Sequence, residues 1–356
     1  MSEQLDWKGA LGVTGCGMVS PVGLSAPASL AAMRAGVTRI TELPGGLAGG
    51  GDAAPEPLAG GQVPVIPAGR QGVARLVRLA CAALQEAVAD AGLARMEQYG
   101  VFLGGPVEKQ GGRLLDYAPS LSQGLSGSLP PCFGNAPVFL FQNGRAAALL
   151  ALRAAAQALS EGRVQVALVG GVDSWVNPLA LKHLADTGRL RGNGKSSGIL
   201  PGEGAAFFCL ERLEHARDRK AAVRAELHAA VGARDETPFG APCKAVVLSR
   251  ILKQIWPAQR EVGPLIISDL NGERHRHFEW MLAASRSLKF KEDTLRHWHP
   301  AEYIGDSGAA SGALCCAWAA TALSRGYACT DGVIVWGGSD EGEREAVLFV
   351  SPGGGE

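Results

Sequence analysis

The chain lacks an excess of charge of either sign. Lysine and arginine together number 34, and aspartate and glutamate also number 34, so the formal net charge is zero. Proteins that bind nucleic acid or an acidic membrane surface usually carry a basic excess, so we expect neither as the main partner. Aromatic residues are also scarce at 6%, whereas glycine is abundant at 49 of 356 residues, which favours close packing between backbones.

Signals for export or membrane insertion are missing too. The first nine residues, MSEQLDWKG, contain neither the basic nor the apolar stretch of a secretory signal. A long uncharged run, Ser307 to Ser324, is rich in glycine, alanine, serine and cysteine. It is too weakly apolar for a membrane span and favours a buried helix. We therefore expect a cytoplasmic protein.

Cysteine is present eight times but never as a Cys-x-x-Cys pair, so neither a zinc ribbon nor a redox motif is indicated. Most of the cysteines lie in apolar segments, as expected of free thiols in a reducing compartment. The glycine-rich run from Thr14 to Gly23 lacks the spacing of a phosphate-binding or dinucleotide-binding loop. We predict no cofactor.

Four histidines form two His-x-His pairs, His275 with His277 and His297 with His299. A zinc site would need further ligands that converge on them, and no carboxylate or cysteine stands beside them at zinc-like spacing. We interpret the four as solvated or capping side chains and predict no metal site.

The stretch from Pro137 to Ser174 organises the rest of the chain. It contains a β-branched and aromatic strand, Val138 to Phe141, which we expect to be buried on both faces. An Asn143-Gly144 turn and a long alanine- and leucine-rich helix follow it. A strand, a sharp turn and a buried helix in this order can present a nucleophile at a helix N-terminus. Here the elbow carries Arg145, which is not nucleophilic and stays protonated.

Two short motifs of this stretch recur near the end of the chain. The helix end ALSEG at 158–162 returns as ALSRG at 322–326, and VALVGGVD at 166–173 returns as VIVWGGSD at 333–340. A self-match over such a long period, in a strand–helix–strand context, indicates two fused α/β halves. The two Gly-Gly strand ends would bring the two helix N-termini together at one central site.

We divide the chain accordingly into an N-terminal half, residues 1–224, and a C-terminal half, residues 225–356. Irregular loops are expected at about 42–69, which is crowded with glycine and proline, and at about 110–135.

Several segments together resemble the β-ketoacyl synthases of the thiolase-like superfamily. They are VTGCGMVSPVG at 13–23, ALVGGVDS at 167–174, PGEGAAFFCLERLEHA at 201–216 and GDSGAASGA at 305–313. The resemblance covers nearly the whole chain in the right order. It implies an α/β fold of five layers, αβαβα, made of two duplicated halves. It also implies a dimer, homomeric or heteromeric, in which the strand at 138–141 pairs across the two-fold axis.

Active members of that family use a cysteine at the elbow and two histidines from loops of the C-terminal half. The thiolate attacks an acyl thioester, and the imidazoles assist decarboxylation and stabilise the oxyanion. The resemblance places the cysteine position on Arg145, the first histidine on Asn271 and the second on Asp306. We therefore name no catalytic residue and regard these three as degenerate positions. We expect Arg145 and Asp306 to pair across the site.

The segments NGERHRHFEW at 271–280 and HPAEYIGDSGAASG at 299–312 are similar to ketosynthase-like proteins encoded near bacterial type VI secretion effectors. That resemblance implies a non-catalytic adaptor or chaperone whose partner is an effector. A second interpretation is the silent subunit of a ketosynthase heterodimer with a paralogous chain. Such subunits usually carry glutamine at the cysteine position, and Gln142 lies three residues early. A third is an acyltransferase with altered chemistry, although the chain is short in the loops that wall an acyl tunnel. We lean towards a protein that is not an enzyme.

Overall fold

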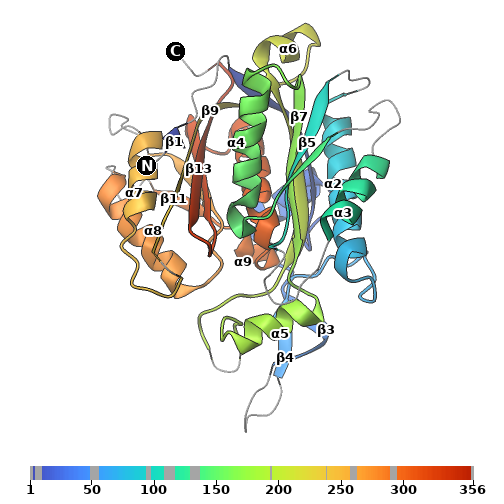
Figure 1. Cartoon of the computed structure of the whole chain (residues 1–356), viewed down its shortest axis with the longest axis vertical. Coiled ribbons are helices and arrows are strands. Elements are labelled where there is room, and N and C mark those ends of the chain that lie inside the picture. Colours follow the sequence, from blue (N-terminus) through green and yellow to red (C-terminus); the bar gives the residue numbers. More distant parts are fainter. Residues whose placement is uncertain are drawn as a thin grey trace.

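Two similar α/β halves face each other across a central helical layer (Figure 1). The computed structural model describes residues 3–4, 10–48, 56–93, 98–107, 117–128, 137–192, 195–237, 239–256, 263–288 and 295–353.

The elements of the first half are β1 (Glu3–Gln4), β2 (Leu11–Val19), α1 (Ala26–Arg34), β3 (Thr41–Ala48), β4 (Glu56–Gly60), α2 (Gly72–Asp90), β5 (Tyr99–Gly104), α3 (Tyr117–Ser128), β6 (Val138–Phe141), the 3-10 turn η3 (Gly144–Ala146), α4 (Ala147–Ser160), β7 (Val166–Ser174), α5 (Pro178–Asp186), β8 (Glu203–Arg212) and α6 (Leu213–Asp218). The elements of the second half are β9 (Ala225–Arg234), α7 (Val246–Ile255), β10 (Leu265–Ser268), α8 (Arg274–Ser287), β11 (Arg296–Trp298), α9 (Ala301–Ile304), the 3-10 turn η5 (Gly308–Ala310), α10 (Ser311–Ser324), β12 (Gly332–Gly338) and β13 (Glu343–Val350).

The strand order shows the duplication directly. In the first half the order is β6-β5-β7-β8-β2, and in the second it is β11-β10-β12-β13-β9, so each strand has a counterpart in the same place. The directions agree as well, because the β5–β6 and β5–β7 pairs are parallel like β10–β11 and β10–β12. The two sheets join where β2 pairs with β9 over Leu11–Val13 and Ala225–Leu227.

Helices cover the outer faces of the two sheets and fill the space between them. Helices α2 and α3 cover one outer face, α7 and α8 cover the other, and α4 lies between the two halves (Figure 1). Helix α10 packs against α4 and against strands of both halves, and every one of its residues except Ser324 is buried. The uncharged run from Ser307 to Ser324 therefore contains a buried helix, as expected. The predicted thiolase-like αβαβα fold of duplicated halves is confirmed.

Small residues let the two central helices approach each other. A Cβ atom added at Gly171 on β7 would lie 2.6 Å from the backbone oxygen of Ala309, well inside contact distance. At Gly312 on α10, an added Cβ would meet the side chains of Leu149 and Ala148 on α4 at 3.1 and 3.3 Å. The abundance of glycine and alanine is thus the composition that a five-layer stack needs.

Three predictions about individual segments were wrong. Strand β6 is not buried on both faces, because it is an edge strand of the sheet and Phe139 is 41% exposed. The loop predicted at about 42–69 contains the two-stranded sheet β3-β4, which lies with α5 in a lobe at the bottom of Figure 1. The loop predicted at about 110–135 contains helix α3, and the rest of that segment lies outside the described residues.

Over the described ranges, no helix combines the length and the hydropathy that crossing a bilayer requires. The division of the chain at residues 224 and 225 stays a prediction. It falls between α6 and β9.

Candidate functional site

The elbow before α4 has an equivalent in the second half. Gly144 opens η3 with φ +55°, and Gly308 opens η5 with φ +53°, a conformation that favours glycine. Each turn leads into a 14-residue helix. Arg145 and Ala309 occupy the matching second positions, so the pseudo-symmetry puts a long cation at one elbow and a methyl group at the other.

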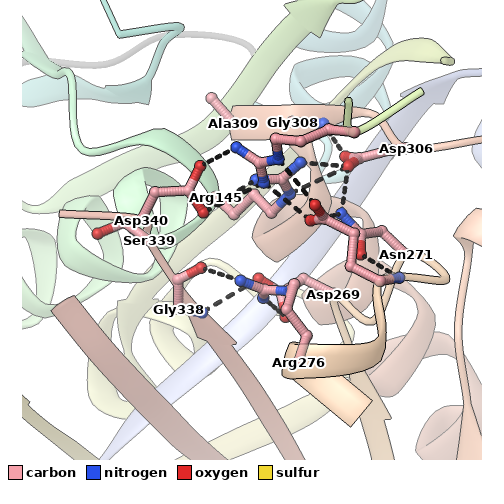
Figure 2. A network of polar contacts seen from close by, with 12 residues as sticks. Arg145, Asp269, Asn271, Arg276, Asp306, Gly308, Ala309, Gly338, Ser339 and Asp340 are labelled. Atoms are coloured by element: carbon pink, nitrogen blue, oxygen red, sulfur yellow. Dashed lines mark hydrogen bonds and ion pairs between the residues drawn. The ribbon is translucent and has the colours of Figure 1, made fainter. Parts of the chain in front are cut away.

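Arg145 is buried, with 3% of its surface exposed, and its guanidinium contacts two carboxylates (Figure 2). Its Nε donates to Asp306 Oδ2 at 3.1 Å, and Nη2 donates to the same oxygen. Nη1 lies 3.7 Å from Asp340 Oδ1. The guanidinium carbon is also 5.7 Å from the centre of the Trp175 ring. The Arg145–Asp306 pair expected from the sequence is therefore present.

Asn271 lies in the same cluster. Its side-chain amide donates to Asp306 Oδ2 at 2.7 Å and to Glu273 Oε2 at 3.0 Å. The structure thus brings together all three positions that the sequence singled out. Asn271 bridges two carboxylates, which an amide can do because its nitrogen carries two hydrogens.

A second arginine, Arg189, closes the network and was not predicted. It donates to both oxygens of Glu273 at 2.7 and 2.8 Å and to Asp340 Oδ2 at 2.6 Å. Asp340 and Glu273 are therefore each held by Arg189, while Asp340 also faces Arg145. Two arginines and three carboxylates give this Arg145–Arg189 network a formal charge of −1.

The pKa values fit a fully ionised network. Burial alone raises the pKa of Asp306, but the charge and hydrogen bonds of Arg145 outweigh it, and the pKa ends below its usual value. Burial also opposes ionisation of Glu273, whose pKa is lowered overall by the hydrogen bond from Arg189 and the charge of Arg145. Burial lowers the pKa of Arg145, yet Asp306 and Asp340 raise it overall. Arg145 is thus a permanent cation with no proton to exchange in catalysis.

Each half caps the elbow of the other. Asp173, at the end of β7, accepts a hydrogen bond from the backbone N–H of Ala309 at 3.0 Å. Asp340, just beyond β12, faces the Arg145 side chain at the equivalent elbow. The signal for this was visible in the sequence, because Asp173 and Asp340 are the aspartates of the repeated Gly-Gly-x-Asp motif.

A separate ion pair lies beside the network. Arg276 and Asp269 are both 3% exposed and approach to 2.5 Å. Arg276 also donates to the backbone oxygen of Gly338 at 2.8 Å, and the N–H of Gly338 donates to Asp269 at 3.1 Å (Figure 2). This pair fixes the Gly-Gly end of β12 against α8. Sequence reasoning missed it, since Arg276 stands within a polar stretch typical of a solvated helix.

Little free space remains around Arg145. The cavity at the elbow measures about 10 Å³, which is the room for about one water molecule. Its lining includes Val107, Trp175 and Glu341 besides Arg145. An acyl chain does not fit this space without displacement of those side chains.

Four cysteines of the described residues, Cys16, Cys209, Cys315 and Cys316, are buried free thiols. Burial raises the pKa of Cys16 to about 12 and raises the pKa values of Cys209, Cys315 and Cys316 well above the usual range. A catalytic thiol needs the opposite shift. Cys132 lies outside the described residues.

The histidine pairs do not assemble a metal centre in the part of the chain that is described. The hydroxyl of Ser268 lies 2.7 Å from His297 Nε2 and 3.2 Å from His299 Nδ1, and the two rings are 4.0 Å apart. Burial lowers the pKa of His299 to about 4 and that of His297 well below its usual value, with a smaller effect from neighbouring histidines. These two are therefore half-buried and neutral at pH 7, not solvated or capping as predicted. His275 instead packs edge-on against Phe239.

Three of the tryptophans, Trp175, Trp280 and Trp336, belong to the core. Trp175, Trp280 and Trp336 are 1–3% exposed, and Trp280 stacks on Trp336 with ring centres 5.6 Å apart.

Comparison with known proteins gives one family. The family model described as "Beta-ketoacyl synthase, N-terminal domain" matches residues 10–216. No curated protein matches the chain by sequence.

Solved ketosynthase structures share the fold over nearly the whole chain. A type II polyketide ketosynthase, AntDE, in complex with its acyl carrier protein AntF, matches with a TM-score of 0.78 at 17% identity, over 96% of this chain and 99% of that one. The ishigamide ketosynthase/chain length factor matches with a TM-score of 0.77 at 20% identity, over 97% and 99%. The ketosynthase from module 6 of the Bacillus subtilis 168 bacillaene synthase gives 0.76 at 14% identity, over 96% and 72%.

Replacing Arg145 with methionine should destabilise the protein by about 3–5 kcal/mol, because it leaves the buried charge of Asp306 without its partner. The double variant Arg145→Met/Asp306→Asn should recover a large part of that loss, since it also removes the charge. Urea unfolding of wild type, both single variants and the double variant measures this coupling. Arg163→Met is the control, because the Arg163–Glu161 pair is about half exposed and should contribute little. Equal stability of Arg145→Met and wild type would show that the pair does not stabilise the fold.

Lowering the pH from 6.5 to 4 should destabilise the protein through His297 and His299. Their pKa values are depressed in the folded state, so the unfolded chain binds more protons in this window and stability falls with pH. The carboxylates of the Arg145–Arg189 network add a loss below about pH 4.5, since their folded pKa values are lowered.

The variant His299→Gln should flatten the profile between pH 6.5 and 4 by an amount on the order of 1–3 kcal/mol. His228→Gln, at an exposed position on β9, serves as the control. Urea midpoints at half-unit pH steps measure both, and a wild-type profile that stays flat down to pH 4.5 would contradict the prediction.

Proposed function

Since the chain belongs to the β-ketoacyl synthase family, we propose that it is a member that has exchanged catalysis for protein interaction. The observation that carries the proposal is the buried ion pair between Arg145 and Asp306 at the elbow. In this proposal Arg145, Asn271 and Asp306 are degenerate forms of the family's cysteine and two histidines. A thiolate cannot form at Arg145, and Asp306 cannot act as a neutral imidazole does.

Adaptor or chaperone of a secreted type VI effector is the specific role we favour. Support for it comes from the resemblance of residues 271–280 and 299–312 to ketosynthase-like proteins encoded near such effectors. The proposed partner is then the effector protein. In this proposal the chain binds the effector in the cytoplasm, before the effector is secreted.

The second candidate is a silent subunit that pairs with a paralogous ketosynthase-like chain. One observation favours it, the match to the ishigamide ketosynthase/chain length factor over nearly the whole of both chains.

An acyltransferase with altered chemistry has less support, because the elbow cavity is about 10 Å³ and the pKa values of the buried thiols are raised.

The purified protein should form no acyl adduct when incubated with acyl or malonyl thioesters of coenzyme A or of a carrier protein. Intact-mass spectrometry and a condensation assay measure this. The triple variant Arg145→Cys/Asn271→His/Asp306→His should also fail to condense, because Trp175, Val107 and Glu341 still line the elbow cavity. An adduct on a cysteine of the wild type, lost when that cysteine becomes alanine, would refute the non-catalytic role.

We further propose that the chain dimerises, with itself or with a paralogue, through strand β6. This strand is apolar and forms an edge of the sheet, and unpaired edges tend to be covered. Phe139 is 41% exposed and stacks on Phe102 at 4.9 Å.

In sedimentation velocity at micromolar concentration we expect a dimer for the wild type and a shift to monomer for Phe139→Lys. Val37→Lys, which changes an apolar residue that is 51% exposed elsewhere on the surface, should remain dimeric. A monomeric wild type with no paralogue bound argues against this interface.

A further inference from the structure

A groove of about 1240 Å³ runs along the outer side of α8. The outward face of the helix forms one wall. The other wall includes Leu200, Leu270 and Ala301. The groove begins beside the Arg145–Arg189 network, since Asn271 and Glu273 also line it, but the network's arginines do not.

Helix α8 presents two large apolar side chains on its outward face. Phe278 and Met281 are 54% and 56% exposed, whereas Glu279 and Trp280 between them are buried. Residues three apart on a helix lie side by side, so Phe278 and Met281 form one apolar ridge in the groove. Exposed apolar side chains gathered in a concave surface indicate a binding site more often than scattered ones do.

Two of the three unpaired charged side chains in the groove are arginines. Arg191 and Arg274 line it, and neither forms an ion pair within the described residues. Among the lining carboxylates, Glu273 is already paired with Arg189, which leaves Glu302. Two unpaired arginines therefore stand against one unpaired carboxylate in the groove.

Building on the proposed interaction role, we propose that this groove, defined by Phe278, Met281, Arg191 and Arg274, binds an acidic amphipathic helix of a protein partner. Apolar side chains of that helix, three or four residues apart, pack on Phe278 and Met281. Its carboxylates pair with Arg274 and Arg191. The volume exceeds the roughly 300–1,000 Å³ of small-molecule pockets, which favours a polypeptide over a metabolite.

Selection from a phage-displayed library of random 16-residue peptides on the full-length protein tests this. We expect enriched peptides with a net negative charge and apolar residues three or four apart. In fluorescence anisotropy, Phe278→Ser/Met281→Ser should weaken their binding at least tenfold, and Arg274→Glu about tenfold. Glu302→Gln should tighten binding a few fold, because it removes the carboxylate that repels the peptide. Raising the salt concentration from 50 to 300 mM should weaken it.

Leu179→Ser and Val65→Ser are matched controls, since both residues are exposed apolar side chains that do not line the groove. They should leave binding unchanged. Enrichment of basic peptides, binding that survives the Phe278→Ser/Met281→Ser change, or no enrichment at all would overturn the proposal. Concentration-dependent self-association lost in the Phe278→Ser/Met281→Ser variant would replace the partner helix with a second copy of this chain. If oleate displaces the labelled peptide as effectively as unlabelled peptide does, the groove binds a lipid instead.

The test separates this inference from the proposed function. An acyl adduct on the wild-type protein would refute the non-catalytic role whatever the groove binds. If a native partner, once isolated, binds wild type and the Phe278→Ser/Met281→Ser variant equally, the groove is not its binding site. The proposed interaction role would then still stand.

Discussion

The buried guanidinium of Arg145 is the constraint on which the centre of this protein depends. A cation at a helix N-terminus is unfavourable with respect to the helix dipole, and burial makes it more so. It is stable here because Asp306 binds it directly and Asp340 lies close by. Those carboxylates in turn require Asn271 and Arg189. The arginine at the elbow is thus matched by polar residues from four distant segments of the chain.

The duplicated fold explains why those segments meet. Each half ends a strand with Gly-Gly-x-Asp, and the aspartate reaches the elbow of the opposite half. At the second elbow, Asp173 caps a backbone N–H beside Ala309, which is the ordinary way to satisfy a helix start. At the first, Asp340 faces a side-chain cation instead. The same scaffold position therefore serves two electrostatic purposes, and the asymmetry between the halves arises from Arg145 against Ala309.

The proposed non-catalytic centre and the proposed interaction surface fit together physically. The elbow cavity is almost filled, and the polar network is rigidly paired, so the centre is suited to holding the two halves together. On the surface of α8, by contrast, the apolar residues Phe278 and Met281 are exposed and line the groove. A binding surface that is already ordered before the partner arrives loses less entropy on binding.

The sequence by itself determined the duplication, and the family resemblance implied the five layers. The repeated ALS-x-Gly and Gly-Gly-x-Asp motifs, the uncharged run that became α10 and the Asn143-Gly144 turn are local signals, and local signals survive without knowledge of the contacts. The resemblance also located Arg145, Asn271 and Asp306, which lie in contact. The structure alone revealed Arg189, the Arg276–Asp269 pair and the neutral histidines. Their roles depend on burial and on partners that lie between 7 and 151 positions away, and the edge exposure of β6 depends on sheet order. No pattern along the chain encodes these, because they exist only once the two halves have packed.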